Sequence, residues 1–467
     1  MSTDSSGQSA LTPLERRAAS ALASIFSLRM LGLFMIYPVF SVYARHLPGA
    51  TPVTIGLALG IYGLTQALLQ IPFGLWSDRI GRRKVITIGL LLFAAGSVLA
   101  ALSHSIYGII AGRALQGAGA VGSVILALMA DLTRDDQRTK AMAIIGMSIG
   151  LSFALAVVAG PVFNSHIGVN GIFWLTAVLA LLGLAVLYMA VPQPDQQRLH
   201  RDNQAVPALL AEVLKNGQLL RLDFGIFAQH AMLTATFLGL PVLLRDSSGL
   251  QVEQEWALYL PVLAASVVLM VPLIIYGERN ARLKSVFIGA IVASGLAQLV
   301  FALGYHSLWL LVPVIVVFFT AFNLLESSLP SLISRLAPAG MKGTAMGVYS
   351  SSQFFGIFVG GVAGGWLQSH FGLPGVFGFS VLLALLWLAV TAGLRNPGHM
   401  SSRVVSLGAL KDEAPELAAS RIRAITGVLD VAVAPEDGTA ILKVDSRQFD
   451  EPALDNLLGK APAATPA

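Results

Sequence analysis

A dense group of charges lies at Asp78–Lys84, in a chain of which only 12% of the residues are charged. Five of the seven residues of DRIGRRK are ionisable, and the group lies between two long apolar segments. An aspartate this close to arginines can form ion pairs that are made in one conformation and broken in another. Such pairs would act as a latch in a moving bundle of helices. The alternative is a solvated turn that only joins two helices.

A second copy of this charge pattern follows 200 residues later, at GERNARLK. It aligns with SDRIGRRK in the acid and in the bases: Asp78 with Glu278, Arg79 with Arg279, Arg82 with Arg282 and Lys84 with Lys284. Repetition at a fixed spacing indicates two similar halves. Because a plain connection has no reason to be built twice, we favour the latch.

Charged residues also lie inside the apolar segments, where each charge is costly and marks a candidate site. Arg29 and Arg113 lie about 10 Å along their segments. Arg29 either neutralises an anionic substrate or anchors its helix by snorkelling towards the interface. Glu326 is the acid that lies deepest in such a segment. It is expected either to carry a coupled proton or to form a structural pair with a basic neighbour.

Candidate substrate contacts are the polar residues inside the segments. Gln66 and Gln70 are four residues apart, so a helix presents them on one face. The full set is Arg29, Gln66, Gln70, Gln229, His230, Asn323 and Gln353. Such side chains also bridge neighbouring helices, and that alternative stays open. The chain has no cysteine, which excludes disulfides, thiolate metal sites and cysteine nucleophiles, and we expect no metal and no cofactor.

Long helices must position these residues, because the composition is that of a membrane protein. Of the 467 residues, 55% are hydrophobic and 12% charged, whereas a soluble protein has roughly 25% charged residues. Segments of about 20 apolar residues cross the roughly 30 Å hydrocarbon layer as helices. We predict twelve such helices, at 20–44, 53–76, 85–102, 107–131, 141–164, 170–191, 220–244, 255–276, 285–304, 307–332, 342–368 and 374–394.

The basic residues between these segments fall on alternate sides. Eighteen Lys and Arg residues lie in the N-terminal segment and in the loops after the even-numbered helices, whereas the other loops carry only Arg45 and Arg245. By the positive-inside rule, both termini are cytoplasmic. The polar stretch 192–219 divides the helices into two sets of six.

The motifs around these charges resemble those of the major facilitator superfamily. Motif A of that family is similar to GLWSDRIGRRK in Gly74, Asp78, Arg79, Gly81, Arg82 and Arg83. Motif B is similar to GRALQGAGA in Arg113, Gln116, Gly117 and Gly119. Motif C, which is associated with antiporters, is similar in Gly146, Gly150, Gly160 and Pro161, although Asn164 and Ser165 replace its closing glycines. The segments FSLRMLGLFMIYPVFSVYARHL and AGPVFNSHIGVNGIFW, together with the small soluble tail, resemble bacterial YajR-type members of that family.

This resemblance implies partners for the latch. Asp78 would meet the start of the eleventh helix near Gly343 and Thr344, because a helix N-terminus favours a carboxylate. Arg82 would pair with Asp131 at the end of the fourth helix. The glycine at position 74 would let another helix approach closely.

The resemblance also implies the fold and the coupling ion. An all-α bundle of twelve helices in two six-helix halves would surround a central cavity. Arg113 would take part in proton-linked transport, so the candidates for proton coupling are Arg113, Glu326 and Asp78.

The composition changes after Asn396-Pro397-Gly398. SRVVSLGALK is typical of a strand, APELAASRIRAITG of an amphipathic helix and VLDVAVAPEDGTAILKVD of a hairpin turning at Glu436-Asp437-Gly438, before a short helix at 452–458. This β-α-β-β-α order resembles a ferredoxin-like fold of the heavy-metal-associated type, without its cysteine pair. The predicted parts are a disordered cytoplasmic N-terminus 1–17, a bundle 18–191, a linker 192–219, a bundle 220–396, a soluble domain 397–460 and a disordered tail 461–467.

We therefore expect a secondary transporter that works by alternating access in a bacterial inner membrane. The sequence has no GxxxxGK[ST] motif, so an ion gradient would drive uphill transport. The first expectation is export of a small amphipathic compound or drug by proton antiport. Proton symport or efflux of a sugar or organic ion is the alternative, and a membrane-anchored sensor acting through the C-terminal domain is a distant one.

The sequence also indicates which partners to expect. A membrane enzyme would need acids and histidines clustered at one membrane face, and the sequence shows no such cluster. We expect a small-molecule substrate, protons and the lipid bilayer as partners, and no nucleic acid. A monomer is expected, with self-association through the C-terminal domain as the alternative.

Overall fold

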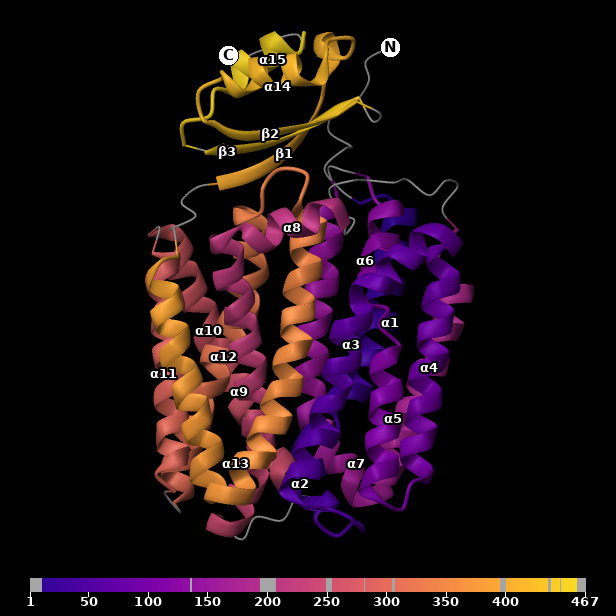
Figure 1. Ribbon diagram of the computed structural model, residues 1–467, viewed down its shortest axis with the longest axis vertical. Helices are drawn as coiled ribbons and strands as arrows, with labels where there is room; N and C mark the ends of the chain where they lie inside the picture. The colour runs from indigo at the N-terminus through magenta and orange to yellow at the C-terminus, as the bar shows by residue number, and fades with distance from the viewer. Residues whose placement is uncertain are drawn as a thin grey trace. The chain divides into compact units, whose positions relative to one another are not determined.

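The computed structural model describes residues 11–134, 137–193, 207–248, 254–280, 282–304, 307–394, 400–435, 438–445 and 447–459 (Figure 1). Residues 1–10 of the predicted N-terminal segment, 194–206 of the predicted linker, the turn residues Glu436 and Asp437 and the tail 461–467 lie outside these ranges. The chain forms two compact units. The first comprises 1–198, 221–329 and 347–394, and the second 199–220, 330–346 and 395–467.

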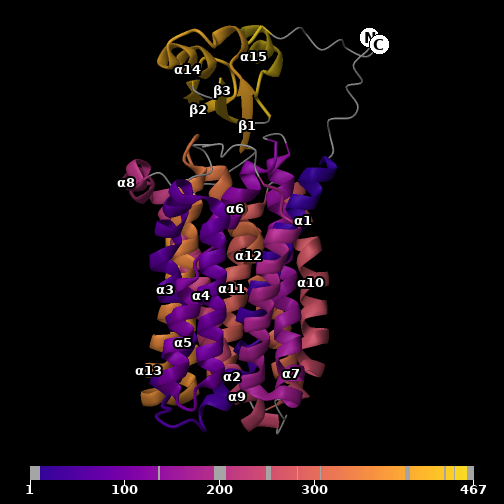
Figure 2. The same ribbon diagram turned by 90° about the vertical axis from the view of Figure 1, so that its right-hand side faces the viewer.

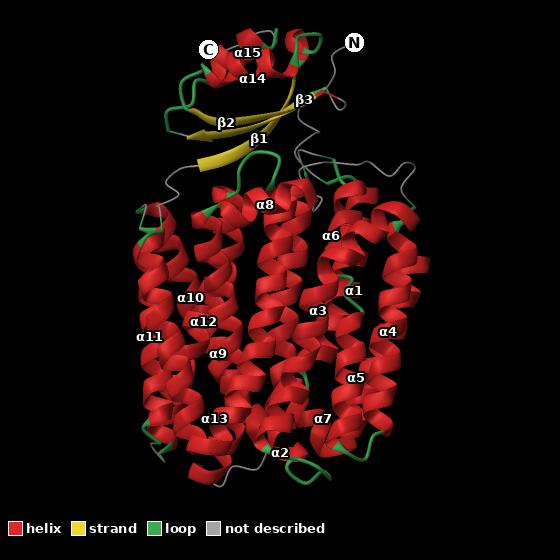
Figure 3. Ribbon diagram, in the orientation of Figure 1, coloured by secondary structure: helices red, strands yellow, loops and turns green. Residues whose placement is uncertain are grey.

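Long apolar helices make up the first unit and run side by side (Figures 1 and 3). The helices of the two bundles are α1 Pro13–Phe34, α2 Tyr37–Ala44, α3 Pro52–Ile80, α4 Arg82–Leu102, α5 Ile106–Ala118, α6 Gly122–Asp131, α7 Arg138–Met189, α9 Gly217–Ser248, α10 Glu255–Arg279, α11 Leu283–Ala302, α12 Leu308–Leu336 and α13 Lys342–Ala392. Within the described ranges, ten helical segments are long and apolar enough to cross a membrane.

Two of these elements are too long to be single spans. Helix α7 has 52 residues and α13 has 51, and at 1.5 Å per residue each would extend well over twice the roughly 30 Å layer. Gly168 and Gly372 interrupt them with φ values of 66° and 65°, which glycine adopts without a side-chain clash. Each element therefore contains two helices, and the breaks fall between the segments predicted from hydropathy.

Helix α1 begins at Pro13, before the predicted start at residue 20, so residues 13–17 are helical and not part of a disordered segment. Thr12 and Glu15 form a capping box, and proline at the first helical position favours the start. The carboxylate of Glu15 also accepts hydrogen bonds from the backbone N–H of Arg134, at 2.8 Å, and from its Nε, at 3.0 Å. The early start was missed because its signals are polar, whereas the prediction followed hydropathy.

Helices α3 and α13 run side by side inside the first unit (Figures 1 and 2), and their backbones come into close contact. A Cβ added at Gly56 would lie 2.1 Å from the carbonyl oxygen of Gly361, and one added at Gly365 would lie 2.4 Å from that of Pro52. Small residues are what allow two membrane helices to approach so closely. This contact joins the N-terminal half of the bundle to the C-terminal half.

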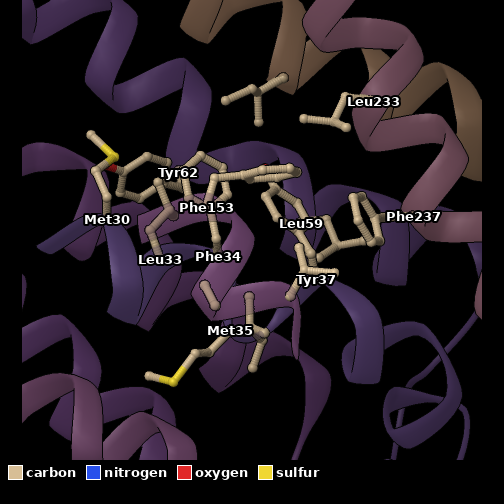
Figure 4. Packing of buried hydrophobic residues seen from close by; sticks show 14 of the residues in the cluster. Met30, Leu33, Phe34, Met35, Tyr37, Leu59, Tyr62, Phe153, Leu233 and Phe237 are labelled. Carbon is tan, nitrogen blue, oxygen red and sulfur yellow. The ribbon is translucent and has the colours of Figure 1, made fainter. Parts of the chain in front are cut away.

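Aromatic rings form a second junction between the halves (Figure 4). Tyr37 stacks on Phe237, with ring centroids 5.5 Å apart, and Phe153 contacts Phe237 at 6.5 Å and Phe322 at 5.4 Å. These rings are buried, at 5% exposure or less. Such pairs favour tilted or offset arrangements and add to the packing energy. The halves are therefore packed together at this level of the bundle.

The second unit contains a small sheet covered by helices. Its elements are α8 Pro207–Lys215, β1 Met400–Ser406, η4 Gly408–Leu410, α14 Pro415–Arg423, β2 Val428–Ala434, β3 Thr439–Asp445 and α15 Glu451–Leu457. The strands are antiparallel in the order β1-β3-β2. Ala418 and Ile422 of α14 pack with Leu442 and Val444 of β3 and with Leu454 of α15 in one apolar core. From β1 to α15, the strands and helices follow the predicted order.

Candidate functional site

Arg82 is the centre of the charged turn between α3 and α4. Gly81 ends α3 with a φ of 104°, a backbone conformation that glycine adopts without strain. The guanidinium of Arg82 pairs with Asp78 and, through Nε at 3.2 Å, with Asp131, and its Nη1 donates to Ser77 at 2.6 Å. Arg82 and Asp131 are almost fully buried, at 4% and 3% exposure. One arginine therefore holds the ends of α3 and α6 together.

Other residues of this turn lie apart from the ion pairs. Arg79 is exposed. Arg83 donates to the carbonyl of Leu187 at 2.7 Å, and its guanidinium lies 5.1 Å from the ring of Tyr188. The close helix approach expected at Gly74 is not observed, because an added Cβ would meet only Ser123, at an ordinary 3.5 Å. The contact of Asp78 with the start of the eleventh helix stays a prediction.

The glycines that resemble motif C differ in how closely other helices approach them. An added Cβ at Gly146 or Gly150 would meet no atom within 4 Å. At Gly160 it would lie 2.3 Å from the carbonyl oxygen of Met35, so the backbone of α7 passes close to the junction of α1 and α2 there. Pro161 follows inside the same helix. Only Gly160 among the three glycines is needed for packing in this conformation.

In the N-terminal half, Arg29 lies at the centre of a buried polar group. Its Nη2 donates to the hydroxyl of Tyr62 at 2.8 Å and to Oε1 of Gln66 at 2.6 Å, and Gln66 donates in turn to Gln70 at 2.8 Å. Arg29 is 1% exposed. Snorkelling of Arg29 towards the interface is therefore wrong, because neighbouring helices cover the side chain and two hydrogen bonds hold it inside the bundle.

Arg113 lies against the same tyrosine. Its Nη1 donates to Gln116 at 3.0 Å, and Gln116 donates to Ser97 at 2.7 Å. The guanidinium carbon of Arg113 lies 5.1 Å from the ring centroid of Tyr62, and that of Arg29 lies 6.0 Å from it. Two buried cations therefore share one aromatic ring, an arrangement that partly offsets their loss of hydration.

In the C-terminal half, Glu326 is held by neutral groups. Gln229 donates to Oε2 of Glu326 at 2.9 Å, and Gln353 donates to Oε1 at 3.4 Å. His230 lies 3.8 Å from the carboxylate and 2.9 Å from Gln353. Among the described side chains, no lysine or arginine pairs with Glu326. Asn323 is not in this group, because it donates to Ser266 at 3.0 Å and bridges α12 to α10.

The two polar groups meet at the contact of α3 with α13. The ring of Tyr62 lies 6.1 Å from that of Phe354, which follows Gln353 in the chain. The structure therefore brings six of the seven predicted substrate residues into two adjoining groups: Arg29, Gln66 and Gln70 in the first and Gln229, His230 and Gln353 in the second. A fixed positive charge lies in one group and a carboxylate in the other, an arrangement suited to binding an ionic solute and a proton.

Asp223 of α9 is a buried acid that the sequence reasoning missed. It is 5% exposed, and neither carboxylate oxygen has a hydrogen-bond partner. Tyr349 lies within electrostatic range of both Asp223 and Glu326, and its hydroxyl is buried without a partner as well. Asp223 was overlooked because it lies near the end of its apolar segment. The available signal was its spacing of seven from His230, which places both on one helix face.

The charges of the described part of the chain do not form a metal centre. No group of three or more histidine, aspartate or glutamate side chains there is arranged to hold an ion. A carboxylate beside a histidine in a span fits proton binding better than metal binding, because a metal needs several converging anionic or imidazole ligands.

Comparison with known proteins agrees with this geometry. The family model of the Major Facilitator Superfamily matches residues 22–360 and 255–424. The chain is 45% identical to the inner membrane transport protein YajR of Escherichia coli (strain K12), over 97% of this chain and 99% of that protein. It is 27% identical to the multidrug resistance protein MdtH of Aeromonas hydrophila, over 74% of this chain and 86% of that protein.

Solved structures share the fold. A point mutant of the nucleoside transporter NupG superposes with a TM-score of 0.64 at 16% identity, covering 81% of this chain and 99% of that one. YajR is named as a transport protein and NupG as a nucleoside transporter. From its sequence and its fold, this chain belongs to the major facilitator superfamily.

Proposed function

We propose that this protein is a proton-coupled secondary transporter that exports small amphipathic compounds by antiport. The observation that carries the proposal is Glu326, a carboxylate in a membrane-spanning helix that Gln229, Gln353 and His230 surround. A carboxylate in a span is costly and marks an ion pathway. The side chains that donate to Glu326 are neutral amides and not fixed cations, which would hold the carboxylate in its charged form. Glu326 can therefore exchange a proton at little cost.

The architecture supports alternating access. Counting the two broken elements α7 and α13 as two spans each gives twelve spans in two halves. The halves are joined by the α3–α13 contact and by the aromatic junction, both of which can open as the halves rock. The 18 to 2 distribution of basic residues supports cytoplasmic termini in a bacterial inner membrane. The small C-terminal sheet and its helices support a ferredoxin-like domain.

The charged turn between α3 and α4 would favour one conformation of the bundle over the other. Arg82 bridges the ends of α3 and α6 through two carboxylates, and opening that end of the bundle separates buried charges from their partners. Asp78 and Arg82 would thus act as a latch that favours one conformation.

The membrane potential provides enough energy for one proton to drive a substrate against its concentration gradient. One proton that moves through 100 mV provides about 2.3 kcal/mol, which supports a gradient of about fiftyfold. The likeness to a multidrug resistance protein favours export of amphipathic compounds.

Flux measurement in proteoliposomes tests the proposal. Purified protein is reconstituted with a pH-sensitive dye inside, and cationic drugs, sugars and organic anions are added under a proton gradient. We expect substrate-triggered proton flux opposite to the substrate, lost in Glu326→Gln and kept in Glu416→Gln, which changes an exposed acid. Flux in the same direction as the substrate would instead indicate symport, and unchanged flux in Glu326→Gln would contradict the role of Glu326.

A further inference from the structure

Two buried guanidinium groups in the N-terminal half have no counter-ion. Arg29 and Arg113 are each 1% exposed. Among the residues that the structure describes, no carboxylate forms an ion pair with either one. A buried charge normally has an opposite charge beside it, because desolvation is not repaid otherwise. The contacts with the Tyr62 and Phe93 rings compensate only in part.

The unpartnered donors of Arg29 are held in place. Its Nη2 is occupied by the Tyr62 hydroxyl and by Gln66. Its Nε and Nη1 are buried and donate to no acceptor. Nη2 of Arg113, which lies against the same tyrosine ring, is also buried without an acceptor. Fixed N–H donors on a cation that is always charged form a binding site for an oxyanion.

The donors of Arg29 and Arg113 lie near the junction of the two halves that also borders the proposed proton site at Glu326. Tyr62, which holds Arg29, contacts Phe354 across the junction of the two halves, and the adjacent Gln353 reaches Glu326. The charged groups near this junction are Arg29 and Arg113 beside Tyr62 in the N-terminal half and Glu326 with His230 in the C-terminal half. An anionic solute held by these donors would therefore lie near the junction of the halves that the group around Glu326 also borders.

We propose that Arg29, with Arg113 as a second positive charge nearby, binds the anionic group of the substrate, and that the substrate is an amphipathic organic acid. This inference rests on the proposed function as a transporter and narrows its substrate class. A cationic compound would meet two like charges at Arg29 and Arg113. A neutral sugar would leave both charges uncompensated.

The test is direct binding to the purified full-length chain in detergent. The probes are p-butylbenzoate, p-butylbenzamide and p-butylbenzylamine, which share a tail and differ in charge. We expect the carboxylate alone to raise the melting temperature in a saturable manner. Arg29→Gln should weaken its binding about tenfold or more, since a charge-assisted hydrogen bond is lost. Arg16→Gln, which changes an exposed arginine, should leave binding unchanged.

Three results would overturn the anion site: no stabilisation by the carboxylate, equal stabilisation by all three probes, or undiminished carboxylate binding in Arg29→Gln. If Arg29→Gln fails to fold, Arg29→Lys serves in its place and should weaken carboxylate binding while preserving its preference over the amide. Binding in detergent needs no proton gradient. Retained carboxylate binding with no proton flux would therefore contradict the coupling mechanism and leave the anion site intact.

Discussion

At the scale of single residues, some buried polar side chains are paired with each other and others have atoms without a partner. We assign a structural role to the paired side chains and a binding role to Arg29 and Asp223. Gln116 and Ser97 satisfy each other, as do Asn323 and Ser266. Such pairs stabilise the contact between two helices. Arg29 and Asp223 instead keep buried atoms that have no partner. A group of this kind costs folding energy, and we propose that Arg29 offsets this cost by binding a ligand and Asp223 by binding a proton.

Asp223→Asn tests this distinction. The substitution removes a buried carboxylate that has no hydrogen-bond partner, so we expect the free energy of unfolding to rise by about 1 kcal/mol. Thermal unfolding in detergent measures the change, with the exposed Asp412→Asn as the control. A decrease in stability would show that Asp223 has a structural role.

At the scale of elements, α3 links the charged turn, the Arg29 group and the other half of the bundle. Its Gly56 packs against the backbone of α13, Tyr62 and Gln66 hold Arg29, and Asp78 pairs with Arg82 near its end. A shift of this helix therefore affects all three places at once. Two substitutions separate its packing role from its electrostatic role.

Gly56→Ala tests the packing of α3 on α13. The new Cβ would lie 2.1 Å from a backbone oxygen, so the helices must separate, and we expect a loss of about 1–3 kcal/mol. Gly150→Ala is the matched control, because its Cβ would meet no atom within 4 Å and alanine favours a helix. Equal melting temperatures for the two variants would contradict the close contact.

Asp78→Asn tests the latch. Losing one carboxylate partner of Arg82 should shift the inward–outward equilibrium about tenfold, or about 1.4 kcal/mol. Because the chain has no cysteine, a pair of introduced cysteines can carry spin labels for distance measurement across the bundle. Arg79→Gln, an exposed neighbour in the same turn, should change nothing. An unchanged distance distribution in Asp78→Asn, with unchanged transport, would exclude the latch.

At the scale of the whole bundle, the aromatic junction closes one level of the space between the halves. Tyr37 and Phe153 come from the N-terminal half, and Phe237, Phe319 and Phe322 from the C-terminal half. Ser41 lies beside this junction, 3.4 Å from the carbonyl oxygen of Phe237, and is 2% exposed. Alternating access requires this packing to separate and re-form.

Phe237→Ala tests the junction. Removal of the ring deletes contacts with three other rings, so the junction should open more often. A single cysteine introduced by Ser41→Cys reports this opening through its rate of maleimide labelling, and we expect the rate to rise about tenfold, equivalent to about 1.4 kcal/mol. An unchanged rate would show that the junction does not control access to this position.

The sequence by itself determined the class of this protein and the limits of most of its helices. Hydropathy and basic residues are local properties, so the predicted segments lie on the described helices. The structure differs at the start of α1, where polar caps matter, and it divides the predicted segments 20–44 and 107–131 into two helices each, α1 with α2 and α5 with α6. The resemblance of the charged turn to motif A implied the pairing of Arg82 with Asp131, and the structure contains this ion pair.

Only the tertiary structure decided which polar residues meet. Arg29 reaches Gln66 across 37 positions and Gln229 reaches Glu326 across 97, and no local pattern specifies such contacts. Burial of Asp223 and the enclosed position of Arg29 depend on neighbouring helices as well. Hydropathy predicts which segments enter the membrane, whereas the packing of one helix on another decides which charges are covered, paired or available to a ligand.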